Sequence, residues 1–81
     1  MVLVFKNSKG KRKVVGYPKD NNRAFNIMND YCLKNNLKVK YYRMWNRDWG
    51  NDKRVTIFDF GSHTEFFYMA DEQYEKELLH K

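Results

Sequence analysis

The stretch RVTIFDFGSHTEFFYM, residues 54–69, decides the fold that we expect for this chain. Two runs rich in β-branched and aromatic residues flank Gly61-Ser62, and glycine at the first position of a two-residue loop favours a type II′ hairpin. In that register Ile57 lies opposite Phe66, and the side chains alternate between the two faces. The faces hold Val55, Ile57, Phe66 and Tyr68 on one side and Phe58, Phe60 and Phe67 on the other. Because both faces are apolar, the hairpin is predicted to lie centrally in a sheet that is covered on each side.

The rest of the chain supplies further strands and two helices. Short apolar or alternating runs predict strands, and apolar residues three and four positions apart predict a helix. The expected order is β-β-α-β-β-β-α, with strands at 2–5, 13–17, 37–45, 53–60 and 64–70, a main helix at 22–36 and a short C-terminal helix at 71–81. The prediction is an α+β fold in a single domain, 1–81, with an antiparallel sheet of about four to five strands packed by one main helix.

The main helix has the clearest periodic pattern. Asp20, Asn21 or Asn22 can cap its start, and Asn35-Asn36 suits its end because asparagine tolerates the left-handed conformation. Its apolar stripe consists of Ala24, Phe25, Met28, Tyr31 and Cys32. Free cysteine is often buried, so Cys32 is interpreted as a small core residue rather than a nucleophile. The core is expected to contain Phe25, Met28, Tyr31, Val39, Tyr41, Val55, Ile57, Phe66 and Tyr68.

Composition indicates the compartment. The 81 residues include one cysteine, which excludes an internal disulfide and fits a reducing cytosol. Met1 leads directly into VLVF, which is too short for a signal peptide, and no apolar run approaches the roughly 20 residues that span a bilayer. We therefore expect a cytoplasmic protein with no membrane partner.

The net charge of +6 is unevenly distributed along the chain. Residues 1–23 hold seven basic residues and one acidic residue, whereas residues 55–81 hold two basic and six acidic residues. A basic end suits an acidic partner, such as a phosphate backbone or an acidic protein face; the other reading is an ordinary solvated surface. The candidate nucleic-acid contacts lie in the first hairpin and are Lys6, Lys9, Lys11, Arg12 and Lys13.

Catalytic and metal chemistry is not expected. The polar side chains around the turn are Asp59, Ser62, His63 and Glu65. A Ser-His-Asp relay needs the histidine between the other two groups, but Ser62 and His63 diverge on a two-residue turn. Asp59 is instead expected to hydrogen-bond across the strands to Thr64. One cysteine and two histidines are too scattered for a metal site, and no glycine-rich phosphate loop occurs. We predict no enzyme activity, no metal and no cofactor.

A second cluster combines cations with tryptophans around a turn at 46–52. Its candidate partner-binding residues are Arg43, Arg47, Trp49, Lys53 and Arg54. Exposed tryptophan beside arginine can stack nucleic-acid bases or form the hot spot of a protein interface. The alternative is structural, with Trp45 in the core on the buried phase of its strand, Trp49 half-buried, and the arginines covering both. Of the two tryptophans, Trp49 is the better candidate for an exposed contact.

The chain resembles two families. From residue 22 onward the order helix, three strands, helix resembles a double-stranded-RNA-binding domain, with Asp71 and Glu72 where that family has a basic motif. The small size, the composition rich in Asn, Lys and aromatic residues, and the stretch VTIFDFGSHTEFFYM resemble small phage-encoded anti-defence proteins such as anti-CRISPR proteins. Many such inhibitors imitate DNA with an acidic surface. For this basic chain the second resemblance implies another mode, the occlusion of a protein surface.

Two hypotheses follow for the function. The first is a non-catalytic phage-type inhibitor, in the cytoplasm of a bacterial host cell, that occludes a bacterial defence or nucleic-acid-processing protein or its complex with nucleic acid. The alternative is a small basic module that binds RNA or DNA directly. A sheet edge, for which VLVF at 2–5 is the candidate, can also pair with a second copy and give a homodimer.

Overall fold

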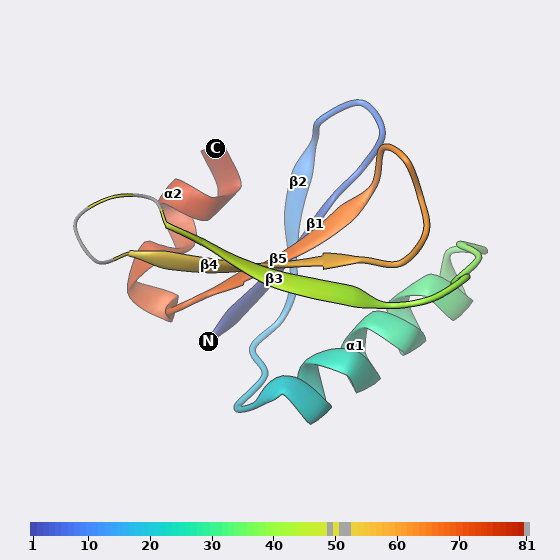
Figure 1. The fold of residues 1–81 in the computed structure, drawn as a ribbon, viewed down its shortest axis with the longest axis horizontal. Helices are drawn as coiled ribbons and strands as arrows, with labels where there is room; N and C mark the ends of the chain where they lie inside the picture. Colours follow the sequence, from blue (N-terminus) through green and yellow to red (C-terminus); the bar gives the residue numbers. More distant parts are fainter. Residues whose placement is uncertain (49, 51–52, 81) are drawn as a thin grey trace.

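A computed structural model describes residues 1–48, 50 and 53–80 of the chain. A five-stranded antiparallel sheet and two helices follow the order β-β-α-β-β-β-α, which confirms the predicted α+β fold (Figure 1). The elements are β1 (Val2–Lys6), β2 (Arg12–Gly16), α1 (Asn21–Lys34), β3 (Arg43–Asp48), β4 (Arg54–Asp59), β5 (Phe66–Ala70), a short 3-10 turn η1 (Glu72–Tyr74) and α2 (Glu75–His80).

The strands lie in the order β2-β1-β5-β4-β3. The first hairpin and the last three strands therefore join where β1 pairs with β5. β5 is the middle strand and β4 is its neighbour, which confirms that the stretch 54–69 is central. Figure 1 shows α1 below the sheet and α2 above it, so each helix covers a different face.

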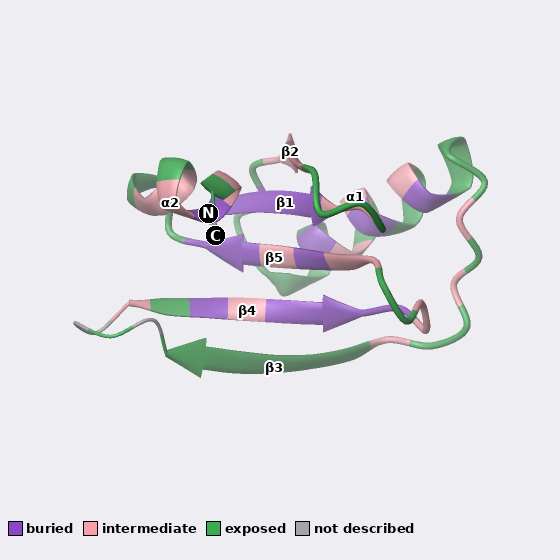
Figure 2. Ribbon diagram, turned by 90° about the horizontal axis from the view of Figure 1, so that it is seen from above, coloured by how far each residue is buried: buried purple, intermediate pink, exposed green. Residues whose placement is uncertain are grey.

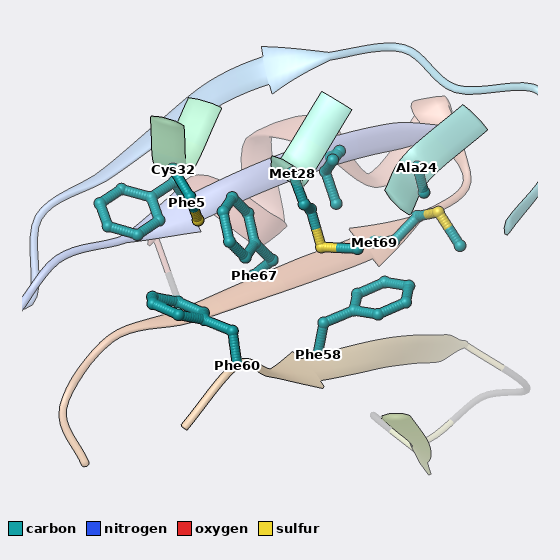
Figure 3. Close-up of a cluster of buried hydrophobic side chains, with 9 residues drawn as sticks. Phe5, Ala24, Met28, Cys32, Phe58, Phe60, Phe67 and Met69 are labelled. Atoms are coloured by element: carbon teal, nitrogen blue, oxygen red, sulfur yellow. The ribbon is translucent and has the colours of Figure 1, made fainter. Parts of the chain in front are cut away.

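α1 covers the larger apolar cluster (Figure 3). Asp20 caps the helix by accepting a hydrogen bond from the Arg23 amide at 2.8 Å, and Asn36 follows its end with a φ of 56°, as predicted for asparagine. Burial raises the pKa of the Cys32 thiol to about 11, which fits the predicted core role because the thiol stays protonated at neutral pH. The cluster consists of Leu3, Phe5, Ala24, Met28, Cys32, Phe58, Phe60, Phe67 and Met69.

α2 closes a second cluster on the opposite face. Its Leu78 is fully buried, and Phe66 and Tyr68 pack at the margin of the cluster. The buried members are Val2, Val4, Val55, Ile57, Ala70 and Leu78. The two faces predicted for the stretch 54–69 are therefore confirmed, with one under each helix.

The register between β4 and β5 differs from the prediction by two residues. Ile57 lies opposite Tyr68 rather than Phe66, and the connection spans residues 60–65 instead of a two-residue turn. Gly61 in this connection has a φ of 97°, and a Cβ there would lie 2.7 Å from the Cβ of Lys40. The longer loop accommodates the chain segment that passes beside it. A shift of two residues keeps every side chain on its face, so the face assignment holds although the register was wrong.

The predicted strand at 37–45 is wrong in its first half. β3 begins at Arg43, and residues 37–42 cross from the end of α1 to the sheet, anchored by a bond from the Lys40 amide to the Phe60 carbonyl at 3.0 Å. Val39 packs partly against the α1 cluster, as predicted, but Tyr41 is 49% exposed and not part of the core. The alternation of apolar and polar residues over 37–42 therefore belongs to a crossing segment and not to a strand. Only some of its side chains, such as Val39, pack against the core.

The prediction that residues 2–5 form a free sheet edge is also wrong. β1 pairs with β2 on one side and with β5 on the other, and its residues Val2, Leu3 and Val4 are fully buried. A four-residue apolar run needs cover on both faces, which an inner strand provides. The edge strands are β2 and β3.

Candidate partner-binding face

β3 presents exposed side chains on the α2 side of the sheet. Its register pairs Trp45 with Ile57 and Arg47 with Val55, and directly opposite residues of an antiparallel pair share a face. Arg43, two residues before Trp45, lies on the same side. We call Arg43, Trp45 and Arg47 the β3 face.

The β3 face is open although it lies on the same side of the sheet as α2, because α2 packs over β1, β2 and β5 and leaves β3 uncovered. α2 follows β5 closely, has six residues and packs on β1, β2 and β5. Figure 2 shows β3 exposed along its whole length, whereas the neighbouring β4 and β5 are largely buried. Trp45, a residue type that is usually well covered, is 38% exposed here.

An ion pair holds the first residue of the β3 face. Arg43 Nη2 lies 2.8 Å from Asp59 Oδ2, and the Gly61 amide donates to Asp59 Oδ1 at 2.9 Å. Asp59 is only 5% exposed. Burial pushes its pKa up, but the hydrogen bonds from Arg43 and Gly61 and the charge of Arg43 outweigh burial and hold the pKa below its ordinary value. Asp59 is therefore charged at neutral pH and positions Arg43.

The other predicted partner-binding residues do not join Arg43 and Arg47. Lys53 Nζ donates to both carboxylate oxygens of Glu77, at 2.8 and 2.9 Å, and therefore ties the start of β4 to α2. Arg54 lies 3.6 Å from Asp48 and points to the α1 side, because it is one residue out of phase with Val55. Trp49 lies outside the described residues.

Trp45 is the residue that the sequence reasoning misjudged. The alternation over 37–45 placed it on the core side, together with Leu37 and Val39. Because β3 begins only at Arg43, the phase of the crossing segment says nothing about the strand. The sequence does contain a signal that identifies the face: Arg43 stands two residues before Trp45, and Arg47 stands two residues after it.

The cations of the first hairpin are divided between the two sides of the sheet. Lys6 lies over the Phe66 ring at 5.8 Å, and Arg12 lies over the Tyr68 ring at 5.1 Å and donates to the Leu78 carbonyl. Lys13 lies on the other side, 5.2 Å from the centre of the Tyr31 ring. Lys9 and Lys11 are exposed at the hairpin tip. The five predicted nucleic-acid contacts therefore do not form one continuous patch.

A hollow of about 300 Å³ lies between this hairpin and α1. It is lined by Phe5, Asn7, Lys11, Arg12, Lys13 and Tyr31. The Phe5 and Tyr31 rings pack together with their centroids 4.9 Å apart, while Asn7 Oδ1 accepts from the Lys9 and Lys11 amides and fixes the hairpin turn. Aromatic rings and lysines thus meet at one small concave site.

The loop at 60–65 does not arrange its polar groups as a catalytic relay. Ser62 Oγ donates to Glu65 at 3.4 Å and accepts from the Glu65 amide at 3.2 Å, so these two residues stabilise the loop. His63 is exposed. Asp59 binds Arg43 rather than Thr64, which corrects the predicted cross-strand bond. Arg43 is its nearest strong donor because the two residues face each other across β3 and β4.

Within residues 1–48, 50 and 53–80, no three His, Cys, Asp or Glu side chains gather in a group that could hold a metal ion. No helix of the described chain is both long and apolar enough to cross a membrane. Comparisons with family models, curated proteins and solved structures found no match.

Proposed function

We propose that this chain is a non-catalytic binding protein, a phage-type inhibitor that occludes a bacterial defence or nucleic-acid-processing protein through its β3 face. The observation that carries the proposal is an exposed tryptophan between two arginines on an open edge strand. Tryptophan and arginine are enriched among the residues that dominate binding energy at protein interfaces. Asp59 holds Arg43 before any partner arrives, which reduces the entropy lost on binding.

The distribution of charge indicates an acidic partner surface. The β3 face carries two arginines, and the chain as a whole carries a net charge of +6. The acidic residues Glu72, Glu75 and Glu77 gather instead around η1 and α2. Complementary charge raises the association rate and disfavours wrong partners. The basic β3 face is therefore expected to meet an acidic patch, while the acidic end of the chain stays away from it.

A pull-down from bacterial lysate, with and without nuclease, tests this proposal. We expect a stoichiometric protein partner that survives nuclease treatment and is lost with Trp45→Ala or Arg47→Glu. Matched controls are Leu33→Ala, which removes a side chain that is 80% exposed on α1, and Lys19→Glu, which reverses an exposed charge before α1. Both controls are expected to retain the partner.

Two results would contradict the proposal. Retention of the partner by both β3 variants would place the contact on another surface. Recovery of nucleic acid with no protein left after nuclease treatment would favour direct nucleic-acid binding instead.

Direct binding of RNA or DNA is the second candidate, and the hollow beside the first hairpin favours it. Lys11 and Lys13 can neutralise phosphates there, and the Tyr31 ring offers a surface on which a base can stack. The hollow lies on the α1 side of the sheet, opposite the β3 face. The two candidate functions therefore use separate surfaces and can be tested separately.

A titration of labelled single-stranded RNA and DNA at several salt concentrations tests the second candidate. Binding should weaken steeply with salt, and Lys11→Ala should reduce the salt dependence by about one released counterion. Lys34→Ala, which removes an exposed lysine from the end of α1, serves as the control. Absence of binding at low salt would exclude this candidate.

A further inference from the structure

The two edges of the sheet differ in how well they are protected. β2 is guarded, because its pairing with β1 contains a bulge, and Arg12 at its start donates to the Leu78 carbonyl of α2 at 2.9 Å. At its other end, a Cβ on Gly16 would lie 2.8 Å from Cδ1 of Ile27, so α1 lies directly against this strand. Bulges and covering elements are two ways in which proteins block further pairing at a sheet edge.

β3 lacks these protections among the described residues. It pairs with β4 over six consecutive residues without a bulge, from Arg43 opposite Asp59 to Asp48 opposite Arg54. All six of its residues are exposed, and no described strand pairs with its outer side. In an edge strand, alternate residues direct their amide and carbonyl groups away from the sheet. β3 therefore offers a regular row of hydrogen-bonding groups to another extended segment.

We propose that β3 binds an extended acidic segment of the partner as an additional strand of the sheet, an inference that rests on the proposed function. Backbone pairing supplies the affinity in this mode of recognition, and alternate side chains supply the specificity. Two acidic side chains of the added strand, four residues apart and on the same face, lie opposite Arg43 and Arg47. An aromatic or apolar residue between them lies opposite Trp45.

Charge distinguishes this occupant from the two others that an open edge admits. A second copy would bring the same two arginines and the same net charge of +6 to the interface, and like charges on facing strands repel. A nucleic-acid strand can neutralise the charges of the arginines, but it has no peptide groups that could continue the backbone hydrogen bonding of the sheet. An acidic peptide segment satisfies both the arginines and the backbone.

A synthetic peptide provides the direct test. The probe is fluorescein-Thr-Glu-Thr-Tyr-Val-Glu-Thr-amide, with the dye on the N-terminal amine, which carries two glutamates on one face with a tyrosine between them. Its control is the same peptide with N-methylated backbone amides, which keeps the charges and removes the donors. We expect the control to bind at least about tenfold more weakly. Amide hydrogen exchange of alternate residues within 43–48 should slow when the unmethylated peptide is added.

A charge swap tests the specificity of the pairing. Arg47→Glu should weaken binding of the glutamate peptide, and a peptide with lysines in place of the glutamates should bind this variant better than it binds the wild-type protein. Lys19→Glu, an exposed charge reversal away from β3, should change neither affinity. This reciprocal pattern requires that the charges face each other across the added strand.

Three results would overturn strand addition. Equal binding of the N-methylated peptide would reduce the contact to side-chain charge, and no binding of the unmethylated peptide to the wild-type protein would remove the proposed mode. Sedimentation as a dimer, with the 43–48 amides protected in the protein alone, would assign the edge to a second copy. A lysate partner that is lost with Trp45→Ala would still support the proposed function after any of these outcomes.

Discussion

β5 and β3 belong to the same sheet but differ in almost every physical respect. Every residue of β5 is buried or half-buried, whereas every residue of β3 is exposed. β5 lies between β1 and β4, while β3 pairs only with β4 among the described strands. The middle of the sheet therefore holds the buried core, whereas the β3 edge contributes little to it. We propose that this exposed edge serves recognition.

The largest expected effect comes from Phe67→Ala in β5. Phe67 is fully buried, and its ring centroid lies 5.2 Å from that of Phe5 and 5.5 Å from that of Phe60. Emptying such a site destabilises a protein by about 3–5 kcal/mol. The total stability of a small domain is about 5–15 kcal/mol, so this loss approaches the whole.

Urea and thermal unfolding measure this loss. Phe67→Leu keeps most of the apolar volume and should cost clearly less, and it provides a measurable variant if Phe67→Ala does not fold. An unchanged unfolding midpoint for Phe67→Ala would show that β5 is not the centre of the core.

The next effect concerns the crossing segment that leads to β3. Gly61→Ala should destabilise the protein by about 1–3 kcal/mol, because φ is positive at this residue and the new Cβ would meet Lys40. Gly10→Ala is the matched control, since Gly10 has a φ of 85° but no atom within 4 Å of the added Cβ. The control should show the smaller loss from backbone strain alone. Equal losses of stability for the two variants would mean that the Lys40 side chain does not lie close enough to Gly61 to clash with the added Cβ.

The sequence predicts the β5 side of this comparison well and the β3 side poorly, for physical reasons. The faces of 54–69 follow from the two-residue period of a strand, which survives an error of two in the register. The length of the loop at 60–65 was not predictable from the local sequence. It depends on the segment that contains Lys40, which is distant in sequence but lies directly beside Gly61.

The candidate site was predicted in part. Arg43 and Arg47 were identified from their cationic and aromatic surroundings, and both lie on the β3 face. Lys53 was not distinguishable from them by sequence, because its partner Glu77 comes from α2. Trp45 was misjudged because tertiary packing, rather than local alternation, determines where β3 begins.

Asp59 connects the two sides of the comparison, since it lies in β4 and holds Arg43 of β3. Asp59→Asn should lower stability at neutral pH by about 1 kcal/mol, a reduced value because Arg43 is largely exposed. The Asp59 pKa is lower in the folded state than its ordinary 3.8. Its stabilising effect is therefore complete above that ordinary value and is lost as the pH falls through the folded-state pKa.

Unfolding measured at neutral pH and at successively lower pH values tests this expectation. The wild-type protein should lose more stability on acidification than Asp59→Asn does. Asp48→Asn is the control, because Asp48 and Arg54 form an exposed pair at 3.6 Å whose loss should have little effect. Identical acid profiles for the wild-type protein and Asp59→Asn would assign the acid sensitivity to other carboxylates.

The smallest effect on stability is expected at Trp45, where the effect on binding is greatest. Trp45→Ala removes the side chain directly opposite Ile57 in the strand pair, and such cross-strand pairs are worth about 0.2–1 kcal/mol. The same change should abolish capture of the lysate partner, because a central tryptophan typically dominates an interface. Unfolding and pull-down are measured on the same preparation, beside Leu33→Ala. If Trp45→Ala destabilises the protein as much as Phe67→Ala, then β3 is part of the core and stability and recognition are not separated. If stability is kept and binding is lost, the exposure of β3 is explained by its partner.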